Sequence, residues 1–513
     1  MSALLTRWQA CGRPEGIAPH TAPAVSRRFA RPSPLALAQR LGGILSSLLL
    51  TGCLGMPAFS PPTVETPAQW RSTPVDARSE AALTKQTLSS IYPVPELDAL
   101  ISEALSAGSD ARIAAERVTL ARLQVGLEAA SALPQLNAAG SAIRQRAPGF
   151  LPDANSLSER GTLALTSSWE LDLWGRLADR TTAARSTAES AEATAAAVRI
   201  SVAAQVASLY FDLLDLDTRQ AITAETLSGR AQSLRLIQAR FDEGIASMLD
   251  VRQAESLLAS AAQSLADQQR RGRQIEHALS VLLGRTPGSV ERALTLGEVS
   301  VPQHLPAGLP SDLLLRRPDI VAAEAALRAA QADISAARKA YLPRLTLTTL
   351  AGFISPDLGR LVLGDRFAWS IEPAVGVSIF DGGRLRAGVN IAESQQRLLV
   401  EQYKAAVRQA FREVEDALAA LTFLSQQRIA SERVALANRD RLRIVEARFL
   451  AGISSYFEVL DAERQLFDSE LALSQLTRDV HQSVIQLYRA LGGGWSVSEL
   501  GTREEGPFTG FDD

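Results

Sequence analysis

The residue types that most often carry out covalent or metal chemistry are scarce in this chain. Its 513 residues include two cysteines, Cys11 and Cys53, and four histidines that lie far apart in the sequence. A thiolate zinc site needs several cysteines, and a histidine-based triad needs acidic and nucleophilic partners. Because the sequence offers no such constellation, we expect no disulfide framework, no metal site, no cofactor and no enzymatic activity.

Cys53 is the one residue with a clear chemical role. The first 50 residues hold six arginines and a single acidic residue, Glu15, and residues 41–50 form an apolar run that is too short to span a membrane. This pattern predicts a lipoprotein signal peptide over residues 1–52. Leu50-Thr51-Gly52-Cys53 resembles a bacterial lipobox, in which the cysteine sulfur carries diacylglycerol. The alternative is an ordinary signal peptide with a chance cysteine.

Residue 54 indicates the destination of a lipidated chain. It is leucine rather than the aspartate that typically retains lipoproteins in the inner membrane, so the lipobox implies the outer membrane. The net charge of −3 gives no reason to expect nucleic-acid binding, which normally needs a basic excess. With 46% hydrophobic and 21% charged residues, the composition is that of an ordered protein.

The rest of the chain contains an internal duplication, in which one sequence unit occurs twice. Gly175-Arg176-Leu177 recurs 208 residues later as Gly383-Arg384-Leu385, and Arg240-Phe241 recurs at the same spacing as Arg448-Phe449. Leu133-Pro134 recurs after 209 residues, so one insertion separates the two registers. This period is too long for a solenoid repeat and predicts one fold with internal pseudosymmetry. The predicted segments are a lipidated tether (53–90), a first repeat (91–286), a linker (287–310), a second repeat (311–497) and a C-terminal tail (498–513).

Each repeat is expected to contain the same order of elements. A helix of moderate length (96–131 and 319–340) precedes two strands, a very long helix (177–241 and 384–449), a glycine-containing turn and a return helix (248–283 and 456–491). A helix of about 65 residues is roughly 100 Å long at about 1.5 Å per residue. Such rods predict an elongated helical structure with coiled-coil-like packing.

The predicted strands alternate apolar and polar residues. One strand covers 162–173 and another 367–380, with a third around 345–348 and the weakest at 136–146. Strands of about 10 residues with one apolar face suit a membrane barrel, although a half-buried soluble sheet alternates in the same way. Four strands cannot close a barrel, and lipid does not tolerate open strand edges. A membrane sheet would therefore require several chains to share one barrel.

Several longer segments resemble a known family. The octapeptide LLLRRPDI at 313–320 is preceded by LPSD, and FDGGR (380–384), FREVEDAL (411–418) and LYRALGGGW (487–495) follow. The chain is identified from these segments as similar to the NodT-type lipoprotein branch of the TolC-like outer-membrane efflux factors. The resemblance covers about residues 62–497.

The resemblance implies a mainly α-helical fold with a membrane β-barrel. Three chains with four strands each would complete a 12-stranded barrel, and their helices would form a periplasmic tunnel. It further implies an exit duct for small amphiphilic compounds. The implied partners are two further copies of the chain, a periplasmic adaptor protein, an inner-membrane transporter of the resistance-nodulation-division type and outer-membrane lipid.

The same resemblance assigns roles to individual residues. It implies that the two helix–helix turns dock the adaptor, although these residues could also serve only to build the turns. The turn residues are Arg240, Phe241, Gly244, Ile245 and Ser247 in the first copy, and Arg448, Phe449, Gly452, Ile453 and Ser455 in the second.

A periplasmic gate is expected just beyond the second turn, at Tyr456, Glu458 and Asp461, with Asp250 contributing from the first copy. Glu458 and Asp461 are three residues apart and share a helical face. In a trimer they would form stacked acidic rings, whereas the plainer interpretation is a solvated helix face. Glu170, Asp172 and Glu372 are expected to face the lumen of the barrel. Arg316 and Arg317 are expected to have a structural role before Pro318, where an arginine can bond carbonyl groups.

Three other functions remain open at this point. The same fold could serve as a secretion duct partnered with an ABC transporter. A coiled-coil lipoprotein without a channel would lack the sheet. An enzyme would need a catalytic constellation that the sequence does not offer.

Overall fold

A computed structural model describes residues 59–71, 87–147, 156–302, 310–362 and 364–495. The chain divides into two units, Met1–Gly55 and Met56–Asp513. Cys53, the predicted signal peptide and the predicted C-terminal tail lie outside the described residues.

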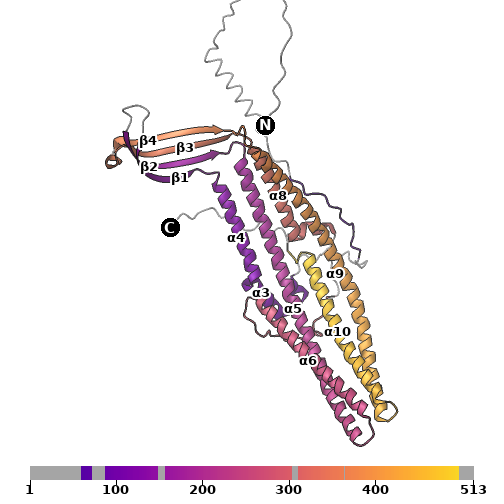
Figure 1. The fold of residues 1–513 in the computed structure, drawn as a ribbon. Coiled ribbons are helices and arrows are strands. Elements are labelled where there is room, and N and C mark those ends of the chain that lie inside the picture. The colour runs from indigo at the N-terminus through magenta and orange to yellow at the C-terminus, as the bar shows by residue number, and fades with distance from the viewer. Residues whose placement is uncertain (1–58, 72–86, 148–155, 303–309, 363, 496–513) are drawn as a thin grey trace, which may run out of the picture. The chain divides into compact units, whose positions relative to one another are not determined.

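The second unit is mainly helical, and its elements recur in the same order (Figure 1). After α2 (Leu88–Ile91), the first copy comprises α3 (Pro95–Ala107), α4 (Ser109–Ala130), β1 (Gln135–Ala147), β2 (Ser156–Leu171), α5 (Arg176–Asp242) and α6 (Met248–Leu282). The second comprises α7 (Pro310–Arg316), α8 (Pro318–Lys339), β3 (Arg344–Ser355), β4 (Phe367–Gly376), α9 (Arg384–Leu450) and α10 (Tyr456–Ala490). The short 3-10 helices η2 (Leu358–Arg360) and η3 (Gly364–Arg366) lie between β3 and β4.

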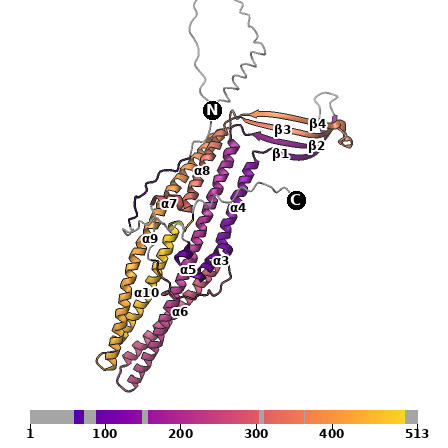
Figure 2. The same ribbon diagram turned by 180° about the vertical axis from the view of Figure 1, so that it is seen from behind.

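The long helices confirm the predicted fold class. Both α5 and α9 contain 67 residues, and both return helices contain 35. Each long helix starts after a glycine in the left-handed region, Gly175 (φ 73°) or Gly383 (φ 88°), where a side chain would be strained. The hairpin turns lie at the end of the unit opposite to the sheet (Figure 2).

The moderate helix of the first copy was predicted as one element over 96–131, which is wrong. It is broken at Gly108, which separates α3 from α4 with an extended backbone (φ −62°, ψ 138°). A Cβ on Gly108 would lie 2.2 Å from the carbonyl oxygen of Ala104 and 2.6 Å from that of Leu282. The break therefore depends on a close approach by the end of α6, which the local sequence does not encode.

The four strands form one antiparallel sheet in the order β1-β2-β3-β4. Paired residues of neighbouring strands share a face, so the register aligns the rows of side chains. Trp369 pairs with Ala351, which pairs with Leu165, on an apolar face, whereas Glu372 pairs with Thr348, which pairs with Ser168, on a polar face. The apolar and polar faces predicted for the separate strands therefore continue from β2 through β3 to β4.

Two strand ends differ from the prediction. β2 ends at Leu171 rather than residue 173, because the chain bends there and the amide of Leu173 bonds the carbonyl of Leu171. β4 ends at Gly376 rather than residue 380, so Phe380 belongs to the connection that leads into α9.

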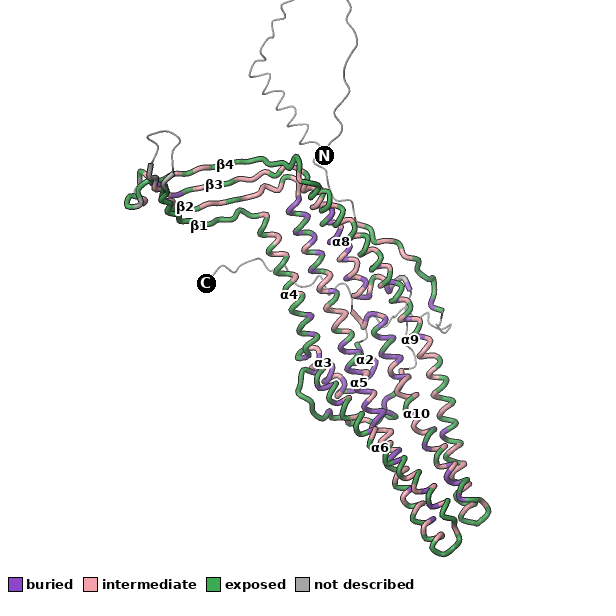
Figure 3. Tube along the Cα trace, viewed as in Figure 1, coloured by how far each residue is buried: buried purple, intermediate pink, exposed green. Residues whose placement is uncertain are grey.

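Most residues of the four strands are exposed or only partly buried within the chain (Figure 3). The apolar face is largely exposed, and Trp369 retains 70% of its accessible surface. Each of β1 and β4 pairs on one side only, which leaves two open edges among the described strands. Such a sheet is incomplete as a soluble structure.

Among the described residues, the helices bury three apolar clusters. The largest lies where α2, α3, α5, α6 and α10 meet, and includes Tyr92, Phe211 and Ile485. Residues 287–302 of the predicted linker close this cluster, since Val290, Leu296 and Val299 are buried in it. α5 includes a stretch with mean hydropathy of 1.3 that is long and apolar enough to cross a membrane, but half of that stretch is buried against neighbouring helices.

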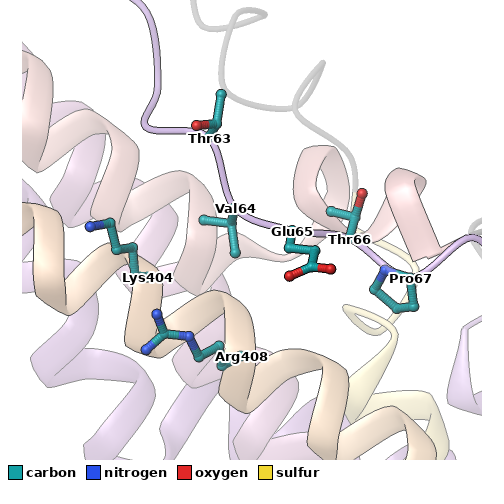
Figure 4. Close-up of a pocket in the computed structure, with 7 residues that line it drawn as sticks. All are labelled: Thr63, Val64, Glu65, Thr66, Pro67, Lys404 and Arg408. Atoms are coloured by element: carbon teal, nitrogen blue, oxygen red, sulfur yellow. The ribbon is translucent and has the colours of Figure 1, made fainter.

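The described part of the predicted tether packs on the helices rather than standing free. Residues 63–67 run beside Lys404 and Arg408 of α9 (Figure 4). Further along, Trp70 is buried with its ring edge-on to Phe411, and the amide of Arg71 donates to Glu415. This strap, residues 59–71, therefore attaches the N-terminal region of the unit to α9.

Candidate functional site

The two helix–helix turns have matching backbones. Gly244 (φ 75°) and Gly452 (φ 73°) occupy the left-handed region that ends a helix tightly. Ser247 and Ser455 then cap the return helices, and each forms a capping box with the acidic residue three positions later. The sequence therefore specifies the turns locally, by a glycine and a capping serine.

The predicted docking residues divide into exposed and inward-facing sets. Ile245 and Ile453 are exposed, as are Ser247, Ser455 and Arg448. Phe241 and Phe449 instead pack on an apolar cluster that joins the two hairpins. The Arg240 guanidinium lies over the Phe449 ring at 4.7 Å, which links one turn to the other.

Sequence reasoning missed two exposed apolar residues beside the turns. Leu249 and Phe457 occupy equivalent positions 208 residues apart, and with Ile245 and Ile453 they are 63–68% exposed. Large apolar side chains at the second position of a helix, outside any buried face, could have indicated them. Together these four residues, which we call the tip patch, give the hairpin ends an apolar surface.

The acidic residues predicted to form a gate all have partners within their own hairpin. Asp250 accepts hydrogen bonds from the amide and hydroxyl of Ser247, at 3.0 and 2.7 Å. Glu458 makes the equivalent, longer contacts with Ser455, at 3.3 and 3.5 Å. These two carboxylates thus stabilise helix starts, a role that the sequence analysis did not assign to them.

Asp461 lies in a more elaborate network. It accepts hydrogen bonds from Arg441 of α9 at 2.8 Å, from Arg464 at 2.9 Å and from Gln465 at 2.9 Å. The hydrogen bond from Arg441 holds the pKa of the Asp461 carboxyl below its usual range. The charge of Asp461 is therefore balanced by arginines inside one chain, and the predicted acidic ring remains a prediction.

Tyr456 is buried at the joint between the hairpins. Its ring lies 5.5 Å from that of Phe449, and it packs with Val459 and Leu460 against Ile237 of α5. Burial raises the pKa of its hydroxyl. Tyr456 thus holds the two hairpins together near their ends.

The three residues predicted to face the lumen occupy different places in the structure. Glu170 and Glu372 are on the polar face of the sheet, and Glu170 forms an ion pair with Arg176 at 2.7 Å. Asp172 was predicted on the same strand, which is wrong, because it lies beyond the end of β2. Its carboxylate accepts the amide hydrogen of Ala178 and so caps the start of α5.

Arg317 makes the structural contacts that the sequence predicted. Its buried guanidinium bonds Asp319 at 2.6 Å, Glu413 of α9 at 2.9 Å and the carbonyl of Ala490 at 3.0 Å. Within the described part of the chain, no group of three or more histidine, cysteine, aspartate or glutamate residues could hold a metal ion.

Comparison with known proteins identifies the family. The sequence profile of the outer membrane efflux protein family matches residues 100–285 and 309–493. The chain is 35% identical over 463 residues to the toluene efflux pump outer membrane protein TtgC of Pseudomonas putida, covering 88% of this chain and 94% of that protein.

It is also 35% identical over 452 residues to the cation efflux system protein CusC of Escherichia coli, covering 88% of this chain and 97% of that protein. Among solved structures, the open state of the Neisseria gonorrhoeae MtrE outer membrane channel superposes with a TM-score of 0.78 at 30% identity, over 86% of this chain and 99% of that one. This chain belongs to the outer membrane efflux protein family.

Proposed function

We propose that three copies of this chain form the outer-membrane exit duct of a tripartite efflux pump, anchored additionally by a lipid on Cys53. The open sheet carries this proposal. Both of its edges are unpaired, one face is apolar and exposed, and the other is polar. Three four-stranded sheets supply the twelve strands of a closed barrel, which removes the edges that lipid excludes.

The polar face then lines the lumen, with Glu170 and Glu372 near its periplasmic end. The helices continue this wall into the periplasm, since α4, α5, α8 and α9 neighbour one another in the same order as the strands. Cargo follows a water-filled path and never enters the lipid. No reaction and no cofactor take part in this function.

The hairpin ends are the proposed docking site for a periplasmic adaptor, which connects the duct to an inner-membrane transporter of the resistance-nodulation-division type. The tip patch supports this assignment, because exposed apolar residues at the end of a polar rod favour a protein partner. The relatives are named for the efflux of toluene and of cations, and for this chain we propose small amphiphilic compounds as cargo.

The gate is proposed to close at the same end. Asp461 with its arginines holds α10 to α9, and Tyr456 packs this hairpin against Ile237 of α5. Opening would require these contacts to rearrange, so they set the resting state of the duct.

A single-cysteine crosslink tests the proposal. Ser247→Cys places a thiol at the exposed turn, and the lipidated Cys53 does not compete for the reagent. In intact cells it should capture an adaptor of a resistance-nodulation-division pump, identified by mass spectrometry. Arg273→Cys on the exposed side of α6, far from the turn, is the matched control and should capture no adaptor.

The crosslinking result distinguishes efflux from protein secretion. Capture of an adaptor from an ABC secretion system would replace efflux by protein secretion. No adaptor at Ser247→Cys, in cells where the trimer is present, would contradict docking through the hairpin ends.

A further inference from the structure

A cavity of about 500 Å³ lies where the sheet meets the helices. It is bounded by the starts of α5 and α9, the end of α8 and the first residue of β3. Four of the residues that line it are arginines: Arg176, Arg180, Arg344 and Arg384. Its volume is in the range of pockets that hold small organic molecules.

The cavity adjoins the polar side of the sheet. Arg344 lies two residues before Thr346, which pairs with Glu170 on the polar face, so Arg344 shares that face. Arg176 bonds Glu170 itself at 2.7 Å. In the proposed trimer this side is the lumen, so solutes in the duct can reach the cavity.

Its charge is predominantly positive. The only carboxylate among the described lining residues is Asp333, whose pKa is raised by burial. Glu128 and Asp381 lie nearby without lining the cavity, and Asp381 accepts amide hydrogens from Gly383 and Leu385. Arg180, Arg344 and Arg384 form no ion pair within 4.0 Å of a described carboxylate, although Arg180 lies near Asp333 and Arg384 lies near Asp381.

Arg176 adds a buried donor. Its side chain is more than nine-tenths buried, and its Nε has no hydrogen-bond partner among the described residues. A buried, unmatched N–H next to a cavity is costly unless a ligand or water accepts its hydrogen. The amino ends of α5 and α9 also lie at the cavity, but the carboxylates of Asp172 and Asp381 already accept their amide hydrogens.

The remaining wall is apolar or small. Ala336 and Ala340 of α8 face the cavity together with Leu385 and Ile391 of α9. Guanidinium groups next to an aliphatic surface match a molecule with an anionic head and an apolar body. Guanidinium binds carboxylate and sulfonate-like heads through paired N–H groups.

We infer that this cavity, which we call the arginine pocket, binds small amphiphiles with one anionic head group as they pass through the lumen. The inference rests on the proposed function for its direction of access, and it names a class of cargo. A neutral or cationic amphiphile has no partner for the arginines and passes without being held.

Equilibrium dialysis of naphthalene-2-sulfonate against the full trimer in phosphatidylcholine nanodiscs tests the inference. We expect saturable binding that weakens as KCl is raised, and no saturable binding of 2-naphthylmethylammonium, which has the same ring and the opposite charge. Arg180→Gln and Arg384→Gln should each weaken binding by roughly fivefold, as for loss of one partly solvated charge pair.

Two variants sharpen the test. Arg386→Gln removes the same charge from the same helix but outside the pocket, and should leave the affinity unchanged. Asp333→Asn should strengthen binding, since it removes the lining carboxylate. An affinity that falls equally in Arg386→Gln, or that does not respond to Arg180→Gln and Arg384→Gln, would overturn the inference.

A lipid occupant is also distinguishable. If adding phosphatidylglycerol to the phosphatidylcholine nanodiscs abolishes binding of the probe, the pocket serves a lipid head group and the inference about cargo is wrong. Because dialysis needs neither adaptor nor transporter, its result is independent of the crosslinking test of the duct.

Discussion

The two copies join their short and moderate helices at equivalent positions, but they stabilise the joint in different ways. Gly108 of the first copy corresponds to Arg317 of the second, 209 residues later, and both face the last residue of a return helix. At Gly108 the carbonyl of Leu282 approaches the backbone too closely for any side chain. At Arg317 the equivalent carbonyl, that of Ala490, accepts a hydrogen bond from the guanidinium.

The hairpins repeat this contrast. Arg230 on α5 donates to the carbonyl of Leu257, and Asn438, at the equivalent place on α9, donates to the carbonyl of Gln465. The hydrogen bond from the long helix to the return helix is the same in both copies, but a buried guanidinium donates it in one and an amide in the other. The contact with the backbone carbonyl therefore recurs in both copies, whereas the side chain that makes it differs.

The strongest test of this difference is Arg317→Met. It removes the guanidinium that bonds Asp319, Glu413 and the carbonyl of Ala490. Both carboxylates keep some contact with water, so we expect a cost of about 3 kcal/mol, mainly from the lost charge-assisted hydrogen bonds. We expect a clear drop in the thermal midpoint of the purified protein, followed by tryptophan fluorescence. Adding Glu413→Gln should recover part of the loss, and no drop at all would mean that the joint of the second copy depends on packing alone.

A second test uses pH, because His481 is buried whereas its counterpart in the first copy, Arg273, is exposed. Burial lowers the pKa of His481 from 6.5 to about 4, while Tyr92 lies 3.0 Å from its Nδ1. The folded chain therefore binds fewer protons than the unfolded chain between these values.

The stabilisation is complete above pH 6.5 and is lost as the pH falls towards 4, by about 3 kcal/mol in total. Thermal midpoints measured from pH 7 to pH 4 should fall more steeply for the wild type than for His481→Gln, which keeps an acceptor but does not titrate. Parallel curves would show that this site is not responsible for acid sensitivity.

Gly108→Ala tests the first-copy joint. The added methyl group overlaps two carbonyl oxygens, and overpacking of this kind costs about 2 kcal/mol. The matched control is Gly229→Ala in α5, where a Cβ meets nothing within 4 Å and helix propensity favours alanine. Unfolding of both variants by urea should show a lower midpoint for the first and an equal or higher one for the second.

The smallest expected effect concerns these hydrogen bonds between the long and return helices. Arg230→Asn should lower the free energy of unfolding by no more than about 1 kcal/mol, since an asparagine forms the same hydrogen bond in the second copy. Arg230→Leu, which cannot donate, should lose more, and urea midpoints of the two variants compare them directly. If leucine were tolerated better than asparagine, the hydrogen bond would not be the reason for a polar residue at this position.

Periodic and local features of the chain could be predicted from the sequence. The long helices predicted over 177–241 and 384–449 match α5 and α9 to within one residue, and the alternation of apolar and polar residues predicted the faces of the strands. The break at Gly108 could not be predicted, because its cause is Leu282, more than 170 residues away.

The candidate site shows the same division between local features, which could be predicted, and contacts between distant elements, which could not. The turn residues follow from glycine and a capping serine, so their positions were clear. The partners of Asp461 were not, since Arg441 reaches it from another helix. The arginine pocket was missed for the same reason, because α5, α8, β3 and α9 each contribute to it.

The open edges of the sheet also have a consequence for inheritance. If each duct draws three chains at random, a cell that makes equal amounts of normal and defective protein builds only about one-eighth of its ducts from normal chains alone. A lesion in β4 that still permits assembly should therefore act dominantly, and a single altered gene copy would suppress most of the export capacity of the cell.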